Sequence, residues 1–182
     1  MKEDLMDMLK YMFVGAIGFG FGGFFWDFLI KFYKDPFQEI MFGPTGGFIF
    51  GLFGGLSLYL LSNKKIQIII YAVIGYVISG LILFSPITRF SVVSMGVGLI
   101  LTGFGAIAGG LFIGLALKRL KLFIVLGALG YITGMYVFGL LLALLSGALN
   151  TVLLFTGLGI GTGLFLGLGM YLAEYPSVNP KE

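Results

Sequence analysis

The stretch from Met41 to Leu61 decides the fold, and it reads MFGPTGGFIFGLFGGLSLYLL without a single charged residue. A helix of this length crosses roughly 30 Å, which is the thickness of the hydrocarbon core of a bilayer. Glycines recur along it every four residues, at Gly43, Gly47, Gly51 and Gly55. Residues at this spacing form one smooth stripe on a helix, and in lipid such stripes allow two backbones to approach closely. The stretch therefore predicts a transmembrane helix that packs through its glycines.

The whole chain has the composition of a membrane protein. Its 182 residues are 59% hydrophobic and 10% charged, with a mean hydropathy of +1.09. In soluble domains about a quarter of the residues are charged. Because the charges here fall in short clusters between apolar stretches, no soluble domain is expected. We predict a single all-α transmembrane domain over residues 1–182, ending in a short polar tail at residues 175–182.

Six apolar stretches are long enough to cross a membrane as helices. They run over Tyr11 to Ile30, Met41 to Leu61, Ile66 to Phe84, Phe90 to Leu117, Leu122 to Leu145 and Thr151 to Ala173. Charged junctions separate the first five, whereas the last junction depends only on Ser146, Gly147 and Asn150. A single helix over the last two stretches would be about 78 Å long, which no bilayer accommodates. The sequence therefore predicts six transmembrane helices.

The distribution of positive charge predicts the orientation. With six crossings, one side of the membrane holds both termini and the second and fourth junctions. That side collects eight of the eleven basic residues: Lys2, Lys10, Lys64, Lys65, Lys118, Arg119, Lys121 and Lys181. The other side holds Lys31, Lys34 and Arg89. Because basic residues concentrate in cytoplasmic loops, we expect a multi-pass protein of the cell membrane with both termini cytoplasmic.

A similar motif recurs in the three helices that lead away from the cytoplasm. The three copies are Gly15-Ala-Ile-Gly18-Phe19, Ala72-Val-Ile-Gly75-Tyr76 and Gly127-Ala-Leu-Gly130-Tyr131. Their central glycines are 57 and 55 residues apart, and the aromatic ring that follows each one is explained by packing. A repeat of this period predicts copies of one supersecondary unit. We expect three tandem helical hairpins, near residues 8–62, 65–117 and 120–174.

The three returning helices carry small residues at four-residue steps, as in a glycine zipper. Besides the stripe that begins at Gly43, they are Gly98, Thr102, Ala106, Gly110 and Gly114 in the second hairpin and Gly159, Gly163 and Gly167 in the third. Such stripes have three interpretations. They pack helices within one monomer, they form an interface with a second copy or another membrane protein, or they line a narrow path for a solute or ion. The lipid bilayer is the partner common to all three.

The residue types present exclude most enzyme chemistry. Without histidine or cysteine, the chain cannot build a Ser-His triad, a Cys-His pair or a thiolate or imidazole metal site. Paired carboxylates need two acids in one cleft, and the apolar spans offer only Asp27. The glycine-rich run from Gly18 to Gly23 does not follow a strand, as a phosphate-binding loop would. We therefore expect no catalytic residue, metal site or cofactor. The grouping of basic residues reflects topology, and no nucleic-acid partner is expected.

Asp27 is an ionisable residue within a predicted span, and such residues are functional candidates. It lies beside Trp26, three residues before the end of the first span. An interfacial tryptophan with a nearby acid is an ordinary membrane anchor. The alternative is a role in ion entry or in pairing with Lys31, one helical turn later. The sequence leaves both interpretations open.

Two short resemblances to known families accompany these patterns. The run Gly43-Pro44-Thr45-Gly46-Gly47 is similar to a motif of the biotin-binding subunits of energy-coupling-factor transporters, which are also small six-helix proteins. It covers five of the 182 residues and that family's other signatures are not found, so no ligand residue is carried over. The tandem glycine-rich hairpins look like the rotor subunits of rotary ATPases. Those proteins carry ions on a mid-membrane carboxylate, which the repeated units here lack.

These observations favour a non-enzymatic membrane protein. The leading class is a structural or complex subunit that acts by helix docking, and the alternative is a small transporter or channel for a solute or ion. Polar residues that converge on one cavity would favour transport. Small-residue stripes that face outward from the monomer would favour docking.

Overall fold

The computed structural model describes residues 2–30, 36–62, 65–83, 95–145 and 154–175, and these form helices and short connections. The helices are α1 (Lys2–Ile30), α2 (Pro36–Leu61), α3 (Gln67–Leu83), α5 (Met95–Leu117), α6 (Leu120–Thr133), α7 (Leu140–Leu145) and α8 (Leu154–Glu174). A π-helical segment, η2 (Gly134–Gly139), joins α6 to α7. The predicted all-α class is confirmed for the described part of the chain.

Four helical segments are long and apolar enough to cross a membrane: Asp4–Leu29, Phe42–Leu61, Leu120–Phe138 and Phe155–Glu174. They correspond to the first, second, fifth and sixth predicted spans. The third and fourth predicted spans coincide with α3 and α5, which contain the shorter apolar segments Gln67–Ile82 and Ile107–Leu117. Large apolar side chains such as Phe13, Leu60 and Leu144 are exposed. Side chains of this kind can contact lipid tails without a cost, because lipid tails are as apolar as leucine.

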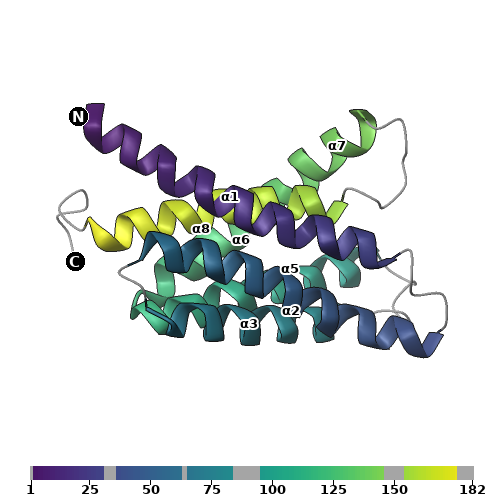
Figure 1. The fold of residues 1–182 in the computed structure, drawn as a ribbon. Helices are drawn as coiled ribbons and strands as arrows, with labels where there is room; N and C mark the ends of the chain where they lie inside the picture. Colours follow the sequence, from purple (N-terminus) through teal and green to yellow (C-terminus); the bar gives the residue numbers. More distant parts are fainter. Residues whose placement is uncertain (1, 31–35, 63–64, 84–94, 146–153, 176–182) are drawn as a thin grey trace.

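Each long helix packs beside its neighbours in the sequence, and the last packs against the first. α1 lies against α2, α2 against α3, α3 against α5, α5 against α6, and α6 against α8. α8 in turn lies along α1 (Figure 1) and makes its most extensive contact with it, so the order of neighbours closes into a ring. The first and last helices are therefore held together by packing, although nearly the whole chain lies between them.

Aromatic side chains fill the space where α1, α2, α3 and α8 meet. The ring centroids of Phe19, Phe50 and Tyr76 lie 4.8 to 5.4 Å from one another. Trp26 lies 5.9 Å from Phe50 and stacks on Phe155 of α8 at 4.4 Å. Ring pairs at these distances add about 0.5–1.5 kcal/mol each to the stabilisation that burial provides. The interior is thus an apolar aromatic core.

The aromatic residues that follow the central glycines of the repeated motif are all buried. Phe19 covers Gly54 and Tyr76 covers Gly109, so a side chain at either glycine would collide with the ring. Tyr131, in the third copy, is 8% exposed. These contacts agree with a packing role for the aromatic ring in each copy.

The fifth predicted span is not one straight helix. The sequence predicts an uninterrupted span from Leu122 to Leu145, but η2 interrupts it and α7 continues in another direction (Figure 1). A π-helical turn accommodates an extra residue and bends the helix axis. The bend begins at Gly134, where an added Cβ would lie only 2.8 Å from the Cα of Leu158 in α8. Hydropathy is similar on both sides of the bend, so it does not reveal the interruption.

The beginning of α1 and the end of α8 lie at the same end of the molecule (Figure 1). The Tyr11 hydroxyl donates a hydrogen bond of 2.5 Å to the Glu174 carboxylate. The rings of Tyr171 and Tyr175 lie 5.9 and 6.4 Å from that of Tyr11. Tyrosines gather at membrane–water interfaces because the ring is apolar and the tip is polar. This cluster therefore marks one rim of the bundle.

Candidate functional site between α1 and α8

Asp27 lies in the last turn of α1 and contacts the first turn of α8. Its carboxylate accepts hydrogen bonds from the backbone N–H of Phe155 at 3.2 Å and of Thr156 at 2.8 Å. The Thr156 hydroxyl donates a third hydrogen bond to it at 2.6 Å. The Asp27 side chain is only 2% exposed. These three hydrogen bonds compensate for the burial of a polar group that would otherwise be costly.

This arrangement is a helix cap supplied by another helix. The first N–H groups of a helix have no partner within it, and the helix dipole favours a negative charge at the same place. α8 begins at Leu154, so Phe155 and Thr156 carry such N–H groups. The Asp27 carboxylate takes the position that a local capping side chain normally occupies. Hydrogen bonds therefore join α1 and α8 at this end, in addition to packing.

The structure places Asp27 differently from the anchor interpretation. The side chain is buried, whereas an interfacial anchor would be exposed, and its hydrogen-bond partners lie on α8. Lys31, the other expected partner, lies outside the described residues. The described residues also contain no cluster of three acids that could hold a metal ion. The geometry thus indicates a structural group that holds α1 against α8.

Glycines bring the backbones of α1 and α8 into direct contact. At each step of the α8 stripe, an added Cβ would overlap a backbone carbonyl of α1. The pairs are Gly159 with Phe19, Gly163 with Gly15, and Gly167 with Tyr11. Gly23 of α1 similarly lies against the Phe155 carbonyl. The α8 stripe therefore faces α1, and sequence reasoning missed the receiving positions, Gly15 and Gly23, which stand eight residues apart on one face of α1.

The α2 stripe faces α3. A Cβ at Gly47 would overlap the Tyr76 carbonyl. At Gly51 it would lie 2.7 Å from the Ala72 carbonyl oxygen, and at Gly55 it would lie 2.9 Å from a Cα atom of α3. Side-chain-free positions at three successive turns thus let the two backbones touch.

The run Gly43-Pro44-Thr45-Gly46-Gly47 lies inside α2, where the helix touches both α1 and α3. A Cβ at Gly46 would overlap the Trp26 ring of α1, and a Cβ at Gly80 of α3 would overlap the Gly43 carbonyl. Pro44 has no N–H to donate, so α2 lacks one internal hydrogen bond here. These contacts give the run a packing role in this chain.

The α5 stripe is described in part. A Cβ at Gly110 would overlap the Phe123 carbonyl of α6, and one at Gly114 would lie 3.0 Å from the Leu120 Cα. Gly98 and Ala106 belong to α5, but their surroundings lie outside the described residues. The described part of the stripe therefore faces α6.

Buried hydroxyl groups bind the backbone of their own helix. Ser57 Oγ donates to the Gly54 carbonyl at 2.7 Å, and Ser62 Oγ donates to the Tyr59 carbonyl at 3.1 Å. Bonds of this local kind are usual for hydroxyl groups in apolar helices. Such bonds occupy these hydroxyl groups without bringing them together at a shared polar site.

A groove of about 450 Å³ lies between α1 and α8, and we refer to it as the α1–α8 groove. α1 contributes the large side chains of Phe13, Ile17, Phe21 and Phe24, and α8 contributes Thr156 and Ile160. Thr156 is polar, but its hydroxyl is hydrogen-bonded to Asp27. The groove is therefore apolar. In the sequence, its α1 residues recur every three or four positions, a pattern that any lipid-facing stripe would also show.

No known protein family, curated protein or solved structure matches this chain. The fold by itself defines a class, an all-helical protein with four described helices that are long and apolar enough to cross a membrane.

Proposed function

We propose that this protein is a non-enzymatic structural subunit of the cell membrane, built from six transmembrane helices in three tandem hairpins, with both termini cytoplasmic. The observation that carries the proposal is the position of the glycine stripes. Wherever they are described, they lie against helices of the same chain. A protein that uses its small residues in this way gains a tightly packed framework.

Equivalent contacts within the hairpins support the repeat. The central glycine of each motif copy packs on the returning helix of its own hairpin. The pairs are Gly18 with Phe53, Gly75 with Ala108, and Gly130 with Gly161, and a Cβ on the glycine would lie 2.9 to 3.1 Å from the partner's carbonyl oxygen. These partners are 55 and 53 residues apart, close to the spacing of the glycines.

Equivalent contacts between the hairpins support a threefold arrangement. They join each returning helix to the outward helix of the next hairpin. The pairs are Gly55 with Ala72, Gly110 with Gly127, and Gly167 with Gly15. The third pair connects the last hairpin to the first, so it completes the cycle that the other two begin.

A subunit of this kind would bind partners through its outer apolar face. Its glycine stripes are engaged internally, and a partner could reach them only by separating α2 from α3 or α1 from α8. Exposed side chains such as Leu60, Ile132 and Leu144 offer an outer surface that needs no such separation. Docking through that surface is the function we propose.

A transporter or channel is the alternative. Such a protein needs polar groups along a path. The buried polar side chains of the described helices include Asp27 of α1, Ser57 of α2, Ser79 of α3 and Thr162 of α8. None of them lines the α1–α8 groove. This distribution favours the structural role.

Two measurements test the proposed function. In a mild detergent extract of native membranes, the particle that contains this chain should exceed the 19.7 kDa of one copy. In proteoliposomes, the purified chain should give no proton, sodium or potassium flux above that of empty vesicles. A particle of single-chain mass would contradict docking. Flux that is lost in Asp27→Asn would replace the structural role with transport.

A further inference from the structure

The α1–α8 groove has the shape to hold a narrow hydrocarbon chain and not a helix. Its floor includes the small residues Ala16 and Gly20 of α1, and large side chains stand above them. Phe13 is 66% exposed and Phe21 is 55% exposed. A partner helix has a diameter of about 10–12 Å and needs small residues at the contact face. Here the phenylalanines keep a second helix away from the small floor residues.

The direction of α7 leaves the groove open. After η2, α7 leans away from α1, as Figure 1 shows. Thr156 and Ile160, in the first two turns of α8, therefore keep a face uncovered beside α1. In a membrane, the molecules that surround such a face are lipids.

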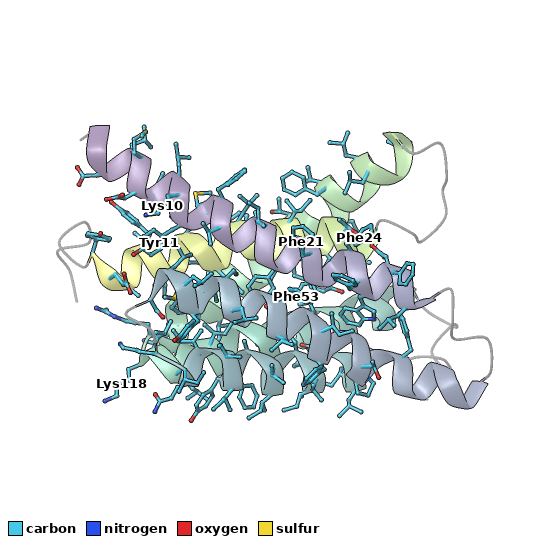
Figure 2. All side chains as sticks on the ribbon, in the orientation of Figure 1. Lys10, Tyr11, Phe21, Phe24, Phe53 and Lys118 are labelled. Atoms are coloured by element: carbon cyan, nitrogen blue, oxygen red, sulfur yellow. The ribbon has the colours of Figure 1, made fainter. Side chains whose placement is uncertain are left out.

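A lysine lies at one end of this line of apolar residues. The large groove residues follow Lys10 at steps of three or four, at Phe13, Ile17, Phe21 and Phe24. This spacing keeps side chains on one face of a helix. Figure 2 shows Lys10 toward the beginning of α1 and Phe21 and Phe24 farther along it. Lys10 is exposed, and the adjacent Tyr11 belongs to the tyrosine cluster at the rim of the bundle.

Two described acids of α1, Asp4 and Asp7, precede Lys10 in the helix, whereas the groove residues follow it. Asp7 precedes Lys10 by one turn, on the side away from the groove, and Glu174 accepts the hydrogen bond of Tyr11. A negative group at the end of the groove would therefore meet Lys10 before it met Asp7. Lysines near the end of a transmembrane helix extend their ammonium groups to the membrane surface, where they attract anionic headgroups.

We propose that the α1–α8 groove binds one acyl chain of an anionic phospholipid, with the headgroup at Lys10. The acyl chain lies over Ala16 and Gly20, and the burial of apolar surface provides the binding. The headgroup charge provides the selectivity. The lipid sits on the contact between the first and last helices, so it reinforces that contact. The site does not depend on the proposed structural role.

Native mass spectrometry of the full chain in detergent tests this site. Phosphatidylglycerol and phosphatidylcholine with identical acyl chains are added at equal concentration. The unmodified chain should retain one phosphatidylglycerol in preference to phosphatidylcholine by about fivefold, the factor that one lysine provides. Lys10→Gln should remove the preference. Lys121→Gln, which changes another exposed lysine, should keep it.

A second pair of variants tests the groove itself. Ile17→Trp places an indole over the floor and should lower retention of both lipids by about threefold. Ile132→Trp changes an isoleucine of similar exposure on α6, outside the groove, and should behave as the unmodified chain. Phe24→Ala removes one wall and should also lower retention. Unfolding temperatures of all variants show whether each remains folded.

Three outcomes would overturn the site. Equal retention of the two lipids, or a preference that survives Lys10→Gln, would remove the headgroup contact. Undiminished retention in the folded Ile17→Trp and Phe24→Ala variants would remove the groove. A lipid-free dimer that Ile17→Trp dissociates would assign the groove to a second copy of this chain. Particle mass in native membranes and ion flux do not enter these readouts, so the proposed function is tested separately.

Discussion

Asp27 accepts hydrogen bonds from two partly buried N–H groups of the first turn of α8, and its removal leaves both without this acceptor. An unsatisfied buried group costs about 1–3 kcal/mol. We expect Asp27→Ala to lower the free energy of unfolding by about that amount. Asp27→Asn should cost less, because asparagine retains an acceptor oxygen and is a comparable cap. Denaturant titration in detergent micelles, followed by circular dichroism, measures both changes.

Asp7 provides the matched control because it is an exposed acid on the same helix. Asp7→Ala should change the free energy of unfolding by no more than about 0.5 kcal/mol. If Asp27→Ala proved equally mild, the carboxylate would not be stabilising α8.

The sequence draws attention to Asp27 but not to its partners. Intramembrane acids are rare, so Asp27 stands out from composition alone. Phe155 and Thr156 lie 128 and 129 residues later in the chain. Helical periodicity places a residue on a face and at a depth, whereas the group that meets it is decided by tertiary packing. The cap was therefore not predictable from one sequence.

At the scale of the element, substitutions at two glycines of α1 distinguish the effect of backbone contact on stability from the effect of helix propensity. A Cβ at Gly15 would overlap the Gly163 carbonyl, whereas the nearest atom at Gly20 is the flexible Ile160 Cγ1 at 3.2 Å. Alanine favours a helix over glycine by about 1 kcal/mol. Gly20→Ala should therefore stabilise the protein by up to about 1 kcal/mol. Gly15→Ala should destabilise it by about 1–3 kcal/mol, because the backbones must separate.

Thermal unfolding of the two alanine variants in one detergent measures the difference. Both substitutions add the same methyl group to the same helix, so propensity cancels between them. Equal shifts in unfolding temperature would show that α1 and α8 do not touch at Gly15.

The α2 stripe leads to a prediction about assembly. Gly47 packs on the Tyr76 carbonyl of the same chain, so Gly47→Leu should destabilise the monomer by about 1–3 kcal/mol or more. The yield of folded protein should fall, and any larger particle should remain a constant fraction of what is folded. Size-exclusion chromatography and thermal unfolding measure these quantities. Phe48→Leu, at an exposed neighbouring position, is the control.

The contrary result for Gly47→Leu is distinctive. If Gly47→Leu abolished an oligomer but left the unfolding temperature of the monomer unchanged, the α2 stripe would face outward. That result would restore the second interpretation of the stripes, an interface with another copy or another protein.

At the scale of the whole molecule, the charge pattern predicts which junctions share a side of the membrane. The chain has no cysteine, so single cysteines can be labelled without background. Cysteines at Lys64 and Lys118 should react with a membrane-impermeant reagent from one side, and cysteines at Lys34 and Arg89 from the other. Labelling of Lys64→Cys and Lys118→Cys from opposite sides would contradict the tandem hairpins.

The sequence accounts for the spans better than for their assembly. Length and hydropathy identify α1, α2, α6 and α8, because the bilayer imposes both on any helix that crosses it. Neighbour relations follow partly from short connections, which place consecutive helices side by side. The contact of α8 with α1 has no such local cause. The bend at η2 and the α1–α8 groove also depend on packing between distant segments, so neither could be predicted.

Closure of the ring predicts that the chain can be opened elsewhere. Termini that lie close together allow circular permutation. The Tyr11–Glu174 hydrogen bond places the end of α8 beside the third turn of α1, so a linker of about six glycine and serine residues should join residue 182 to residue 1. The permuted chain would begin at Lys65 and end at residue 64. It keeps each of the proposed hairpins intact, and both new ends fall in the second junction, on the side of the membrane predicted for residues 1 and 182.

This permuted chain should lose only about 1 kcal/mol of stability, because joining one short loop and opening another nearly offset in closure entropy. Its unfolding temperature in detergent measures the loss. The matched control uses the same linker but opens the chain at Pro86, inside the second hairpin. Its ends fall on the side predicted to hold few basic residues, which disfavours insertion, so its yield should be lower. If the two permuted chains were equally unstable, the packing of α1 against α8 would not stabilise the protein. The helices would then form an open row.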